Sequence, residues 1–188
     1  MYKSIFETIV TLGTNPVPTW KKLAQNISSE GETFLSRFVY PLIGMTTLAN
    51  FIGILWNRKG FQFEYALKSS AVTFVTLFAA FFLASYILNK LFIRYFNKPD
   101  SLPLTQQFVG YTYSFSYVIQ ILQSLLPSLF FLKFALLYVI YVIWVGSDSF
   151  MNIPEKSRIK FMAVVSFVLF VVPILIEKIF FMLMPRLS

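Results

Sequence analysis

Hydroxyl and amide side chains gather in one charge-free stretch, GYTYSFSYVIQILQSLLP at residues 110–127, which is long enough to cross a bilayer. Residues three or four apart share one face of a helix. This spacing places a polar stripe along one face: Tyr113, Ser116, Tyr117, Gln120 and Gln123. Ile119 and Leu122 lie on the opposite, apolar face. Hydrocarbon offers polar groups no hydrogen-bond partners, so we expect the stripe to face other helices or water.

Two kinds of chemistry suit such a stripe. In the first, its groups form hydrogen bonds with neighbouring helices, each worth about 0.6 kcal/mol in membrane proteins. Candidate partners on the two preceding apolar segments are Asn50, which we count with the intramembrane polar set, and Thr46, Thr47, Thr73, Thr76 and Ser85. In the second, the stripe lines a hydrated path or a pocket for a solute, an ion or a lipid headgroup. The first is favoured, because coupled transporters usually carry Asp, Glu or His at mid-membrane; an inward-facing Glu177 would be an exception.

Catalytic and metal-binding chemistry is not predicted. The sequence has no cysteine and no histidine, so it offers no thiolate and lacks the commonest general base and metal ligand. A glycine-rich phosphate loop, a Gly-x-Ser-x-Gly turn and paired intramembrane carboxylates are also missing from the sequence,. We therefore expect a protein that is not an enzyme and that holds no metal and no cofactor.

The apolar segments that must position the stripe predict an all-α integral membrane protein. Of the 188 residues, 57% are hydrophobic and 13% are charged, against about 25% charged residues in soluble domains. The apolar runs do not alternate with polar residues as barrel strands do. We expect a bundle over residues 37–188 with five membrane-spanning helices at about 37–57, 66–96, 105–126, 129–147 and 157–183. Pro41 and Pro173 should bend the first and last of these helices.

Residues 1–36 precede the first predicted span and form a cytoplasmic or interfacial segment of short amphipathic helices. Asn15-Pro16-Val17-Pro18 separates one helix from the next, which carries Trp20, Lys21 and Lys22. An apolar face with a Trp and a basic flank is typical of a helix in the headgroup plane. Packing of these helices on the end of the bundle is the alternative, and both can hold. The residues predicted at the membrane interface are Trp20, Lys21, Lys22, Lys90 and Arg94.

The positions of Lys and Arg predict the orientation. With five spans, the side of the N-terminus carries Lys3, Lys21, Lys22, Arg37, Lys90, Arg94, Lys98, Lys156, Arg158 and Lys160. The other side carries Arg58, Lys59, Lys68, Lys133, Lys178 and Arg186. The larger set favours a cytoplasmic N-terminus and an outer or lumenal C-terminus, in the inner (plasma) membrane if the protein is bacterial. The net charge of +8 suits contact with anionic lipid headgroups rather than nucleic acid.

Three stretches of the chain resemble the Yip family of five-span membrane proteins, which interact with Ypt/Rab GTPases in eukaryotes. They are Asn15 to Leu23, Gly110-Tyr111-Thr112-Tyr113-Ser114, and Leu137 to Gly146 with Ile153 to Arg158. Eukaryotic members carry a long polar N-terminal region and an Asp-Leu-Tyr-Gly-Pro-like motif, of which Val39-Tyr40-Pro41-Leu42 is at most an echo. The chain is therefore more similar to prokaryotic members. The GTPase partnership is not carried over, because the residues that would support it are not recognisable.

The resemblance implies a non-enzymatic membrane scaffold or adaptor with a role in membrane organisation or trafficking, whose partners are itself or another membrane protein. Asp148, Glu155, Lys156 and Arg158 form a candidate docking loop, with a merely solvated loop as the alternative. The other function hypothesis is a small channel or transporter that uses the polar stripe. A scaffold predicts a dry, packed stripe, and a transporter predicts a wet one.

Overall fold

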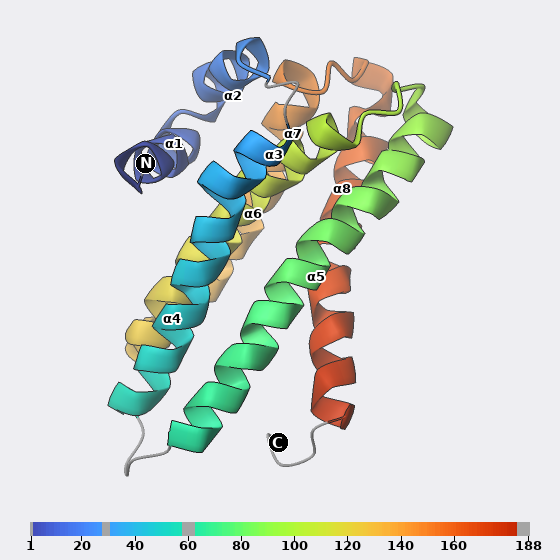
Figure 1. The fold of residues 1–188 in the computed structure, drawn as a ribbon. Helices are drawn as coiled ribbons and strands as arrows, with labels where there is room; N and C mark the ends of the chain where they lie inside the picture. Colours follow the sequence, from blue (N-terminus) through green and yellow to red (C-terminus); the bar gives the residue numbers. More distant parts are fainter. Residues whose placement is uncertain (1, 28–30, 58–62, 184–188) are drawn as a thin grey trace.

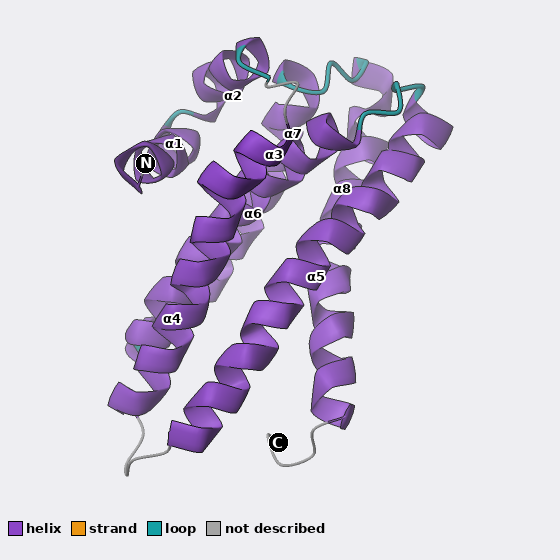
Figure 2. Ribbon diagram, in the orientation of Figure 1, coloured by secondary structure: helices purple, strands orange, loops and turns teal. Residues whose placement is uncertain are grey.

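The computed structural model describes residues 2–27, 31–57 and 63–183. Within these ranges the chain is helical, with short loops and no strand (Figure 2). The elements are α1 (Tyr2–Thr14), α2 (Pro16–Gln25), α3 (Gly31–Phe34), η1 (Leu35–Val39), α4 (Tyr40–Asn57), α5 (Phe63–Phe96), α6 (Leu102–Leu125), η2 (Pro127–Ala135), α7 (Leu136–Ser149) and α8 (Glu155–Leu183).

Proline and asparagine set the helix boundaries. A proline stands at the first or second position of α2, α6 and η2, where its missing N–H costs no intrahelical bond. Asn97 and Asn152 follow α5 and α7 and both have a φ of 49°, a left-handed conformation that Asn tolerates better than most residues. These two asparagines let the chain reverse direction at the same end of the bundle.

A wide π-helical turn, η1, stands next to the bend predicted at Pro41. The N–H of Tyr40 donates to the carbonyl of Leu35, five residues back. Such turns occur as single insertions in otherwise α-helical segments. The irregularity therefore begins before the proline, and α3, η1 and α4 together form one helical segment.

Helix α6 occupies the middle of the bundle and packs against α4, α5 and α7 (Figure 1). Around it, α5 packs against α4 and α8, and α8 also packs against α7. Helices α1 and α2, which we call the cap, lie at one end of the bundle with the loops 97–101 and 150–154; we call this the cap end. Helix α8 finishes at the opposite, far end (Figure 1). Because the chain runs from one end of the bundle to the other in α4, α5, α6, α7 and α8 in turn, α1 and the last turn of α8 lie near opposite ends of the bundle (Figure 1).

Among the described residues, four helical segments are long and apolar enough to cross a membrane: Glu32–Asn57, Phe63–Phe96, Pro127–Ser149 and Glu155–Phe180. The chain is an integral membrane protein. Helix α6 has 24 residues but is not among the four, because its polar side chains lower its mean hydropathy. A fifth span at α6 stays a prediction, and its central place among the other helices supports it.

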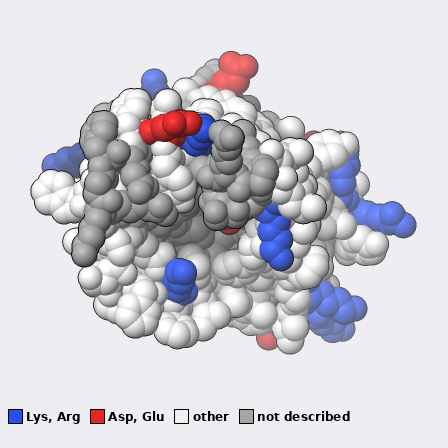
Figure 3. Space-filling view, turned by 90° about the horizontal axis from the view of Figure 1, so that it is seen from below, with Lys and Arg blue, Asp and Glu red and all other residues white. Residues whose placement is uncertain are grey.

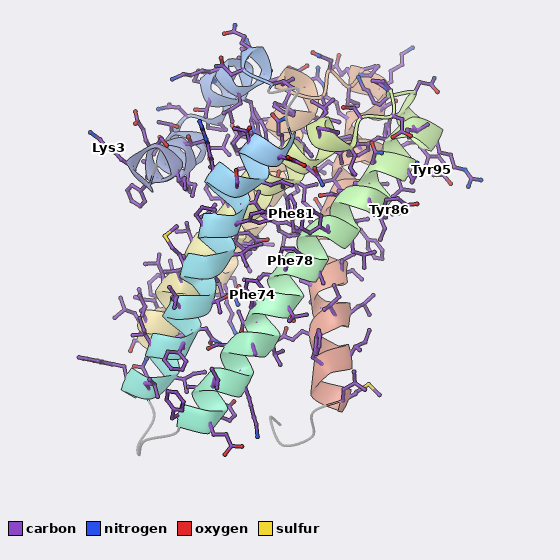
Figure 4. All side chains as sticks on the ribbon, in the orientation of Figure 1. Lys3, Phe74, Phe78, Phe81, Tyr86 and Tyr95 are labelled. Atoms are coloured by element: carbon purple, nitrogen blue, oxygen red, sulfur yellow. The ribbon has the colours of Figure 1, made fainter. Side chains whose placement is uncertain are left out.

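The outer surface of the long helices is apolar, as contact with lipid requires. Phe74 and Phe78 are exposed along α5, and Tyr86 and Tyr95 lie nearer the cap end (Figure 4). Lys90 lies 5.8 Å from the centre of the Tyr86 ring, and Arg94 lies 5.6 Å from that of Tyr95. Aromatic and basic side chains together are typical of the membrane interface, and the place of Lys90 and Arg94 at that interface stays a prediction.

The described helices begin two to six residues before the predicted spans, as Phe63 for 66 and Glu155 for 157 show. The predicted fourth span, 129–147, starts as the 3-10 helix η2 and not as α-helix. Arg58, Lys59 and Arg186, which entered the orientation argument, lie outside the described residues. The orientation of the chain therefore stays a prediction.

A candidate polar cavity and its cap

The polar stripe of α6 lines one cavity of about 430 Å³. Helices α5 and α8 and the junction of η2 with α7 form its other walls. The stripe residues that line it are Tyr113, Ser116, Tyr117, Gln120 and Gln123. Ile119, which sequence reasoning placed on the opposite face, is buried and lines the same cavity. The central position of α6 explains this difference, because most of its circumference contacts protein.

Asn50 does not join the stripe, although the sequence grouped them. Its Nδ2 donates to Ser69 Oγ at 3.2 Å and to Thr73 Oγ1 at 3.0 Å, both on α5. The hydroxyls of Thr46 and Thr47 donate to carbonyls of their own helix. These groups therefore tie α4 to α5 or stay within α4. Thr76 and Ser85, the other expected partners, have no side-chain hydrogen bond among the described residues, so the expected bonds to the stripe do not form there.

Tyr113 donates a hydrogen bond to a backbone carbonyl that a proline leaves without its usual donor. Its hydroxyl donates to the carbonyl of Leu169 at 3.1 Å. In a regular helix that carbonyl would accept the N–H four residues later, but this position is Pro173, inside α8. Proline has no N–H. Tyr113 thus supplies the missing donor and fastens α6 to α8.

Replacing Tyr113 with phenylalanine should lower the free energy of unfolding by about 1 kcal/mol, because the buried carbonyl of Leu169 loses its donor. In a Pro173→Ala background, residue 173 can donate to that carbonyl, so the same change should cost less. Thermal unfolding of the four proteins in detergent measures this coupling. Tyr117→Phe is the matched control, because its hydroxyl has no partner among the described residues. Equal costs in both backgrounds would contradict the assigned role.

Tyr117 carries an unpartnered hydroxyl deep in the cavity. The residue is 3% exposed, and its ring stacks on that of Tyr113 with centroids 5.7 Å apart. Neither its hydroxyl nor Gln123 Nε2 has a hydrogen-bond partner among the described residues. A buried polar group without a partner costs about 1–3 kcal/mol. These two groups mark where a bound molecule would find free hydrogen-bonding capacity.

Two opposite charges line the cavity near the far end. Lys133 comes from η2, and Glu177 comes from α8. A second cavity of about 140 Å³ continues between α5 and α8 and shares Gln120, Pro173 and Glu177 with the first. Figure 3, viewed from the far end, shows the surface hollowed near its middle. The sequence allowed an inward-facing Glu177, but it gave no sign that Lys133 would share a wall with it.

Toward the cap end, five buried rings fill the bundle; we call them the aromatic plug. They are Trp20, Phe92, Phe108, Phe150 and Phe161. Ring centroids lie 5.4 Å apart for Trp20 and Phe108, and 4.8 Å apart for Phe92 and Phe161. No ring of the plug lines either cavity. These two cavities therefore lie on the far side of the plug, and a third, of about 210 Å³, lies at the cap end between the cap, η1 and α6.

One of the two sequence-based alternatives placed Trp20 toward the lipid headgroups, but the structure places it inside the protein. It is fully buried, and its Nε1 donates to the carbonyl of Val142 at 3.1 Å. A Cβ on Gly146 would lie 2.8 Å from the Trp20 ring, so the missing side chain makes room for the indole. Tyr138 adds a second attachment, because its hydroxyl donates to the carbonyl of Gly13 at 2.8 Å. The cap is thus packed on the bundle, and Lys21 and Lys22 stay exposed.

The loops at the cap end are joined to one another. Lys98 Nζ donates to the carbonyl of Asn152 at 2.9 Å, and partial burial lowers the pKa of this lysine. Asn89 Nδ2 donates to Asp100 Oδ1 at 2.7 Å, and Lys90 lies 3.4 Å from the other carboxylate oxygen. These two neighbours lower the pKa of Asp100.

Within the proposed docking loop, Asp148 pairs with Arg158. Arg158 Nε also donates to the carbonyl of Ile153 at 3.3 Å. Glu155 and Lys156, in the first turn of α8, are exposed. Two of the four predicted docking residues are thus engaged with each other, and the other two form no ion pair among the described residues; the docking role itself stays a prediction.

The model of the Yip1 domain matches residues 10–176, from the cap to the last turns of α8. This chain belongs to the Yip1 domain family. No curated protein and no solved structure matches the chain.

The three stretches by which the sequence resembles the Yip family converge at one place in the Yip1 fold. Trp20 from the first stretch lies against Gly146 from the third. Tyr111 from the second meets the Trp20 ring edge-on, with centroids 6.0 Å apart. Gly110 lets Phe34 approach, since a Cβ there would lie 2.8 Å from the Phe34 ring. These motif residues therefore build the attachment of the cap, and Tyr113, from the second stretch, also lines the cavity.

Proposed function

We propose that this Yip1-family protein is a non-enzymatic membrane scaffold or adaptor, of the prokaryotic type, that acts through its cap end. The observation that carries the proposal is the fully buried Trp20, which fixes α2 on the bundle. A fixed cap presents Lys21 and Lys22 outward at a constant position beside the loops of the cap end. A docking surface profits from such rigidity, because less conformational freedom is lost on binding.

The closed aromatic plug supports a scaffold over a small channel or transporter. A path through the bundle would have to displace rings such as Phe92, Phe108 and Phe161, which are buried against one another. The stripe lines a cavity and is therefore not packed dry, as we expected of a scaffold, but it ends before these rings. In the described residues, no cluster of acidic side chains offers a metal site, and the Yip family is generally non-enzymatic.

The basic side chains at the cap end indicate which membrane surface and which partners this end meets. Exposed basic side chains at the cap end include Lys21, Lys22, Lys156 and Lys160, and they suit a cytoplasmic face that meets anionic headgroups. The partner is another copy of the chain or a different membrane protein. In a bacterium, the location would be the inner membrane with the N-terminus in the cytoplasm.

Site-specific photo-crosslinking in intact cells tests the docking face. A photoreactive residue at Lys22 or Glu155 should give discrete adducts with protein, because both positions face outward at the cap end. The matched control is Lys68, an exposed residue at the far end. Protein adducts at Lys22 and Glu155 but not at Lys68 are expected. Equal adducts at all three positions, or a specific solute flux through the reconstituted protein, would contradict the proposal.

A further inference from the structure

We propose that the cavity between α5, α6 and α8 is a binding site for a phospholipid whose headgroup carries a primary amine. This goes beyond the scaffold function, which concerns the cap end. The lipid would enter from the leaflet at the far end, with its headgroup near Lys133 and Glu177 and an acyl chain directed toward Tyr113. Three features of the cavity support this occupant.

The first feature is the gradient of polarity along the cavity. The walls beside Tyr113 are apolar and come from Leu77, Ala80 and Leu169. Toward the far end the lining becomes polar, with Gln120, Gln123, Lys133 and Glu177. Pockets for amphipathic ligands combine apolar walls with a few polar groups that fix orientation. A membrane lipid has the same gradient, from a hydrocarbon chain to a charged head.

The second feature is the pair of opposite charges. Lys133 and Glu177 line one cavity from different elements, yet neither forms an ion pair among the described residues. A phosphate would meet the Lys133 ammonium, and a primary ammonium would donate hydrogen bonds to the Glu177 carboxylate. A choline headgroup has no N–H to donate, and a headgroup without an amine leaves Glu177 unmatched. The two charges together therefore select an amine-bearing zwitterion.

The third feature is the unpartnered hydroxyl of Tyr117. It is buried, lines the cavity and has no hydrogen-bond partner within the described part of the chain. It lies about one helical turn deeper than Gln120 and nearly two turns deeper than Gln123. The ester groups of a phospholipid lie just below the headgroup, and their carbonyl oxygens can accept a hydrogen bond from the Tyr117 hydroxyl. A water-soluble solute would leave the apolar end of the cavity unfilled.

The bilayer supplies such a ligand directly. Ile174 lines the cavity and is also exposed on the outer surface of α8. Phe134, next to Lys133, is exposed as well. The entrance is thus flanked by side chains suited to lipid, and a phospholipid can approach by diffusing in the plane of the membrane.

Native mass spectrometry of the full chain, delipidated in a mild detergent, tests the site with three added lipids: phosphatidylethanolamine, phosphatidylcholine and phosphatidylglycerol. We expect phosphatidylethanolamine to bind about tenfold more tightly than the other two, because only it makes both charge-assisted contacts. Glu177→Gln should abolish this preference, and Lys133→Gln should weaken the binding of all three lipids. Equal affinities for the three lipids in the unsubstituted protein would overturn the proposal.

Glu64→Gln and Lys68→Gln are the matched controls, because they remove the same charges from a pair at the far end that does not line the cavity. Both should keep the lipid preference. A loss of preference in the controls equal to that in Glu177→Gln would show a general surface effect and would overturn the site. Free phosphoethanolamine is the last probe: if it displaces the lipid at equal concentration, the ligand is a soluble amine and not a phospholipid. Unfolding temperatures of all four variants verify that each is folded.

Discussion

Replacing Trp20 with alanine is expected to release the cap from the bundle. The indole is fully buried and donates to the carbonyl of Val142 at 3.1 Å. Truncating a buried Trp to Ala costs about 3–5 kcal/mol, which is large for a cap of two short helices, although the buried Ile5, Ile9 and Leu12 also attach it. Hydrogen exchange of residues 2–25 should rise strongly, whereas exchange within α5 and α8 should stay slow. Hydrogen exchange followed by mass spectrometry measures both regions in one experiment.

Two variants control for this result. Lys21→Ala removes an exposed neighbour on the same helix and should leave exchange unchanged. Trp20→Phe keeps most of the ring packing but loses the donor, so its effect should be intermediate. If Trp20→Ala exchanged no faster than Lys21→Ala, the cap would not depend on this side chain, and the docking face that we propose would lose its physical basis.

Replacing Gly53 with alanine is expected to separate α4 from α6. A Cβ at this position would overlap the backbone carbonyl of Ser124, and a backbone cannot move aside as a side chain can. Overpacking typically costs about 1–3 kcal/mol, and more where the neighbour is rigid. Small residues at helix contacts in membranes permit this kind of close approach. Thermal unfolding in detergent should therefore show a large drop in melting temperature.

Gly44 provides the matched control on the same helix. A Cβ there meets no atom within 4 Å, and alanine has a higher helix propensity than glycine by about 1 kcal/mol. Gly44→Ala should therefore be neutral or slightly stabilising. Equal losses for the two variants would mean that the glycines matter for chain flexibility and not for the contact between α4 and Ser124.

Hydropathy predicted where helices occur, because a run of apolar residues in a membrane must form its backbone hydrogen bonds internally. It did not predict the 3-10 geometry of η2, where Leu129 adopts φ −85° and ψ 35°. The sequence also left the position of Trp20 undecided between two alternatives. Its spacing fits a helix at a lipid surface as well as a helix on protein, and only the facing Gly146 distinguishes the two.

The helical period placed the stripe residues of α6 on one cavity, because residues on one helix keep fixed relative directions. How each neighbouring helix is rotated about its axis cannot be determined from one segment alone. The sequence therefore did not show that Asn50 forms its hydrogen bonds with α5 and not with the stripe. One signal was readable in advance. Pro173 leaves the carbonyl of Leu169 without its helical donor, so the sequence predicts that another group must donate to this carbonyl. It does not identify Tyr113 as that group.

The aromatic plug fills the bundle toward the cap end, and the stripe of α6 lines a cavity toward the far end. Because the chain has no cysteine, a single introduced thiol can be labelled with a membrane-impermeant maleimide from either side of sealed vesicles. Gln123→Cys should react only from the side of the C-terminus, and Lys21→Cys only from the other side. Thr112→Cys, at a fully buried position of α6, should react from neither side. Labelling at Thr112 in the folded protein would reveal a path through the bundle and contradict this account.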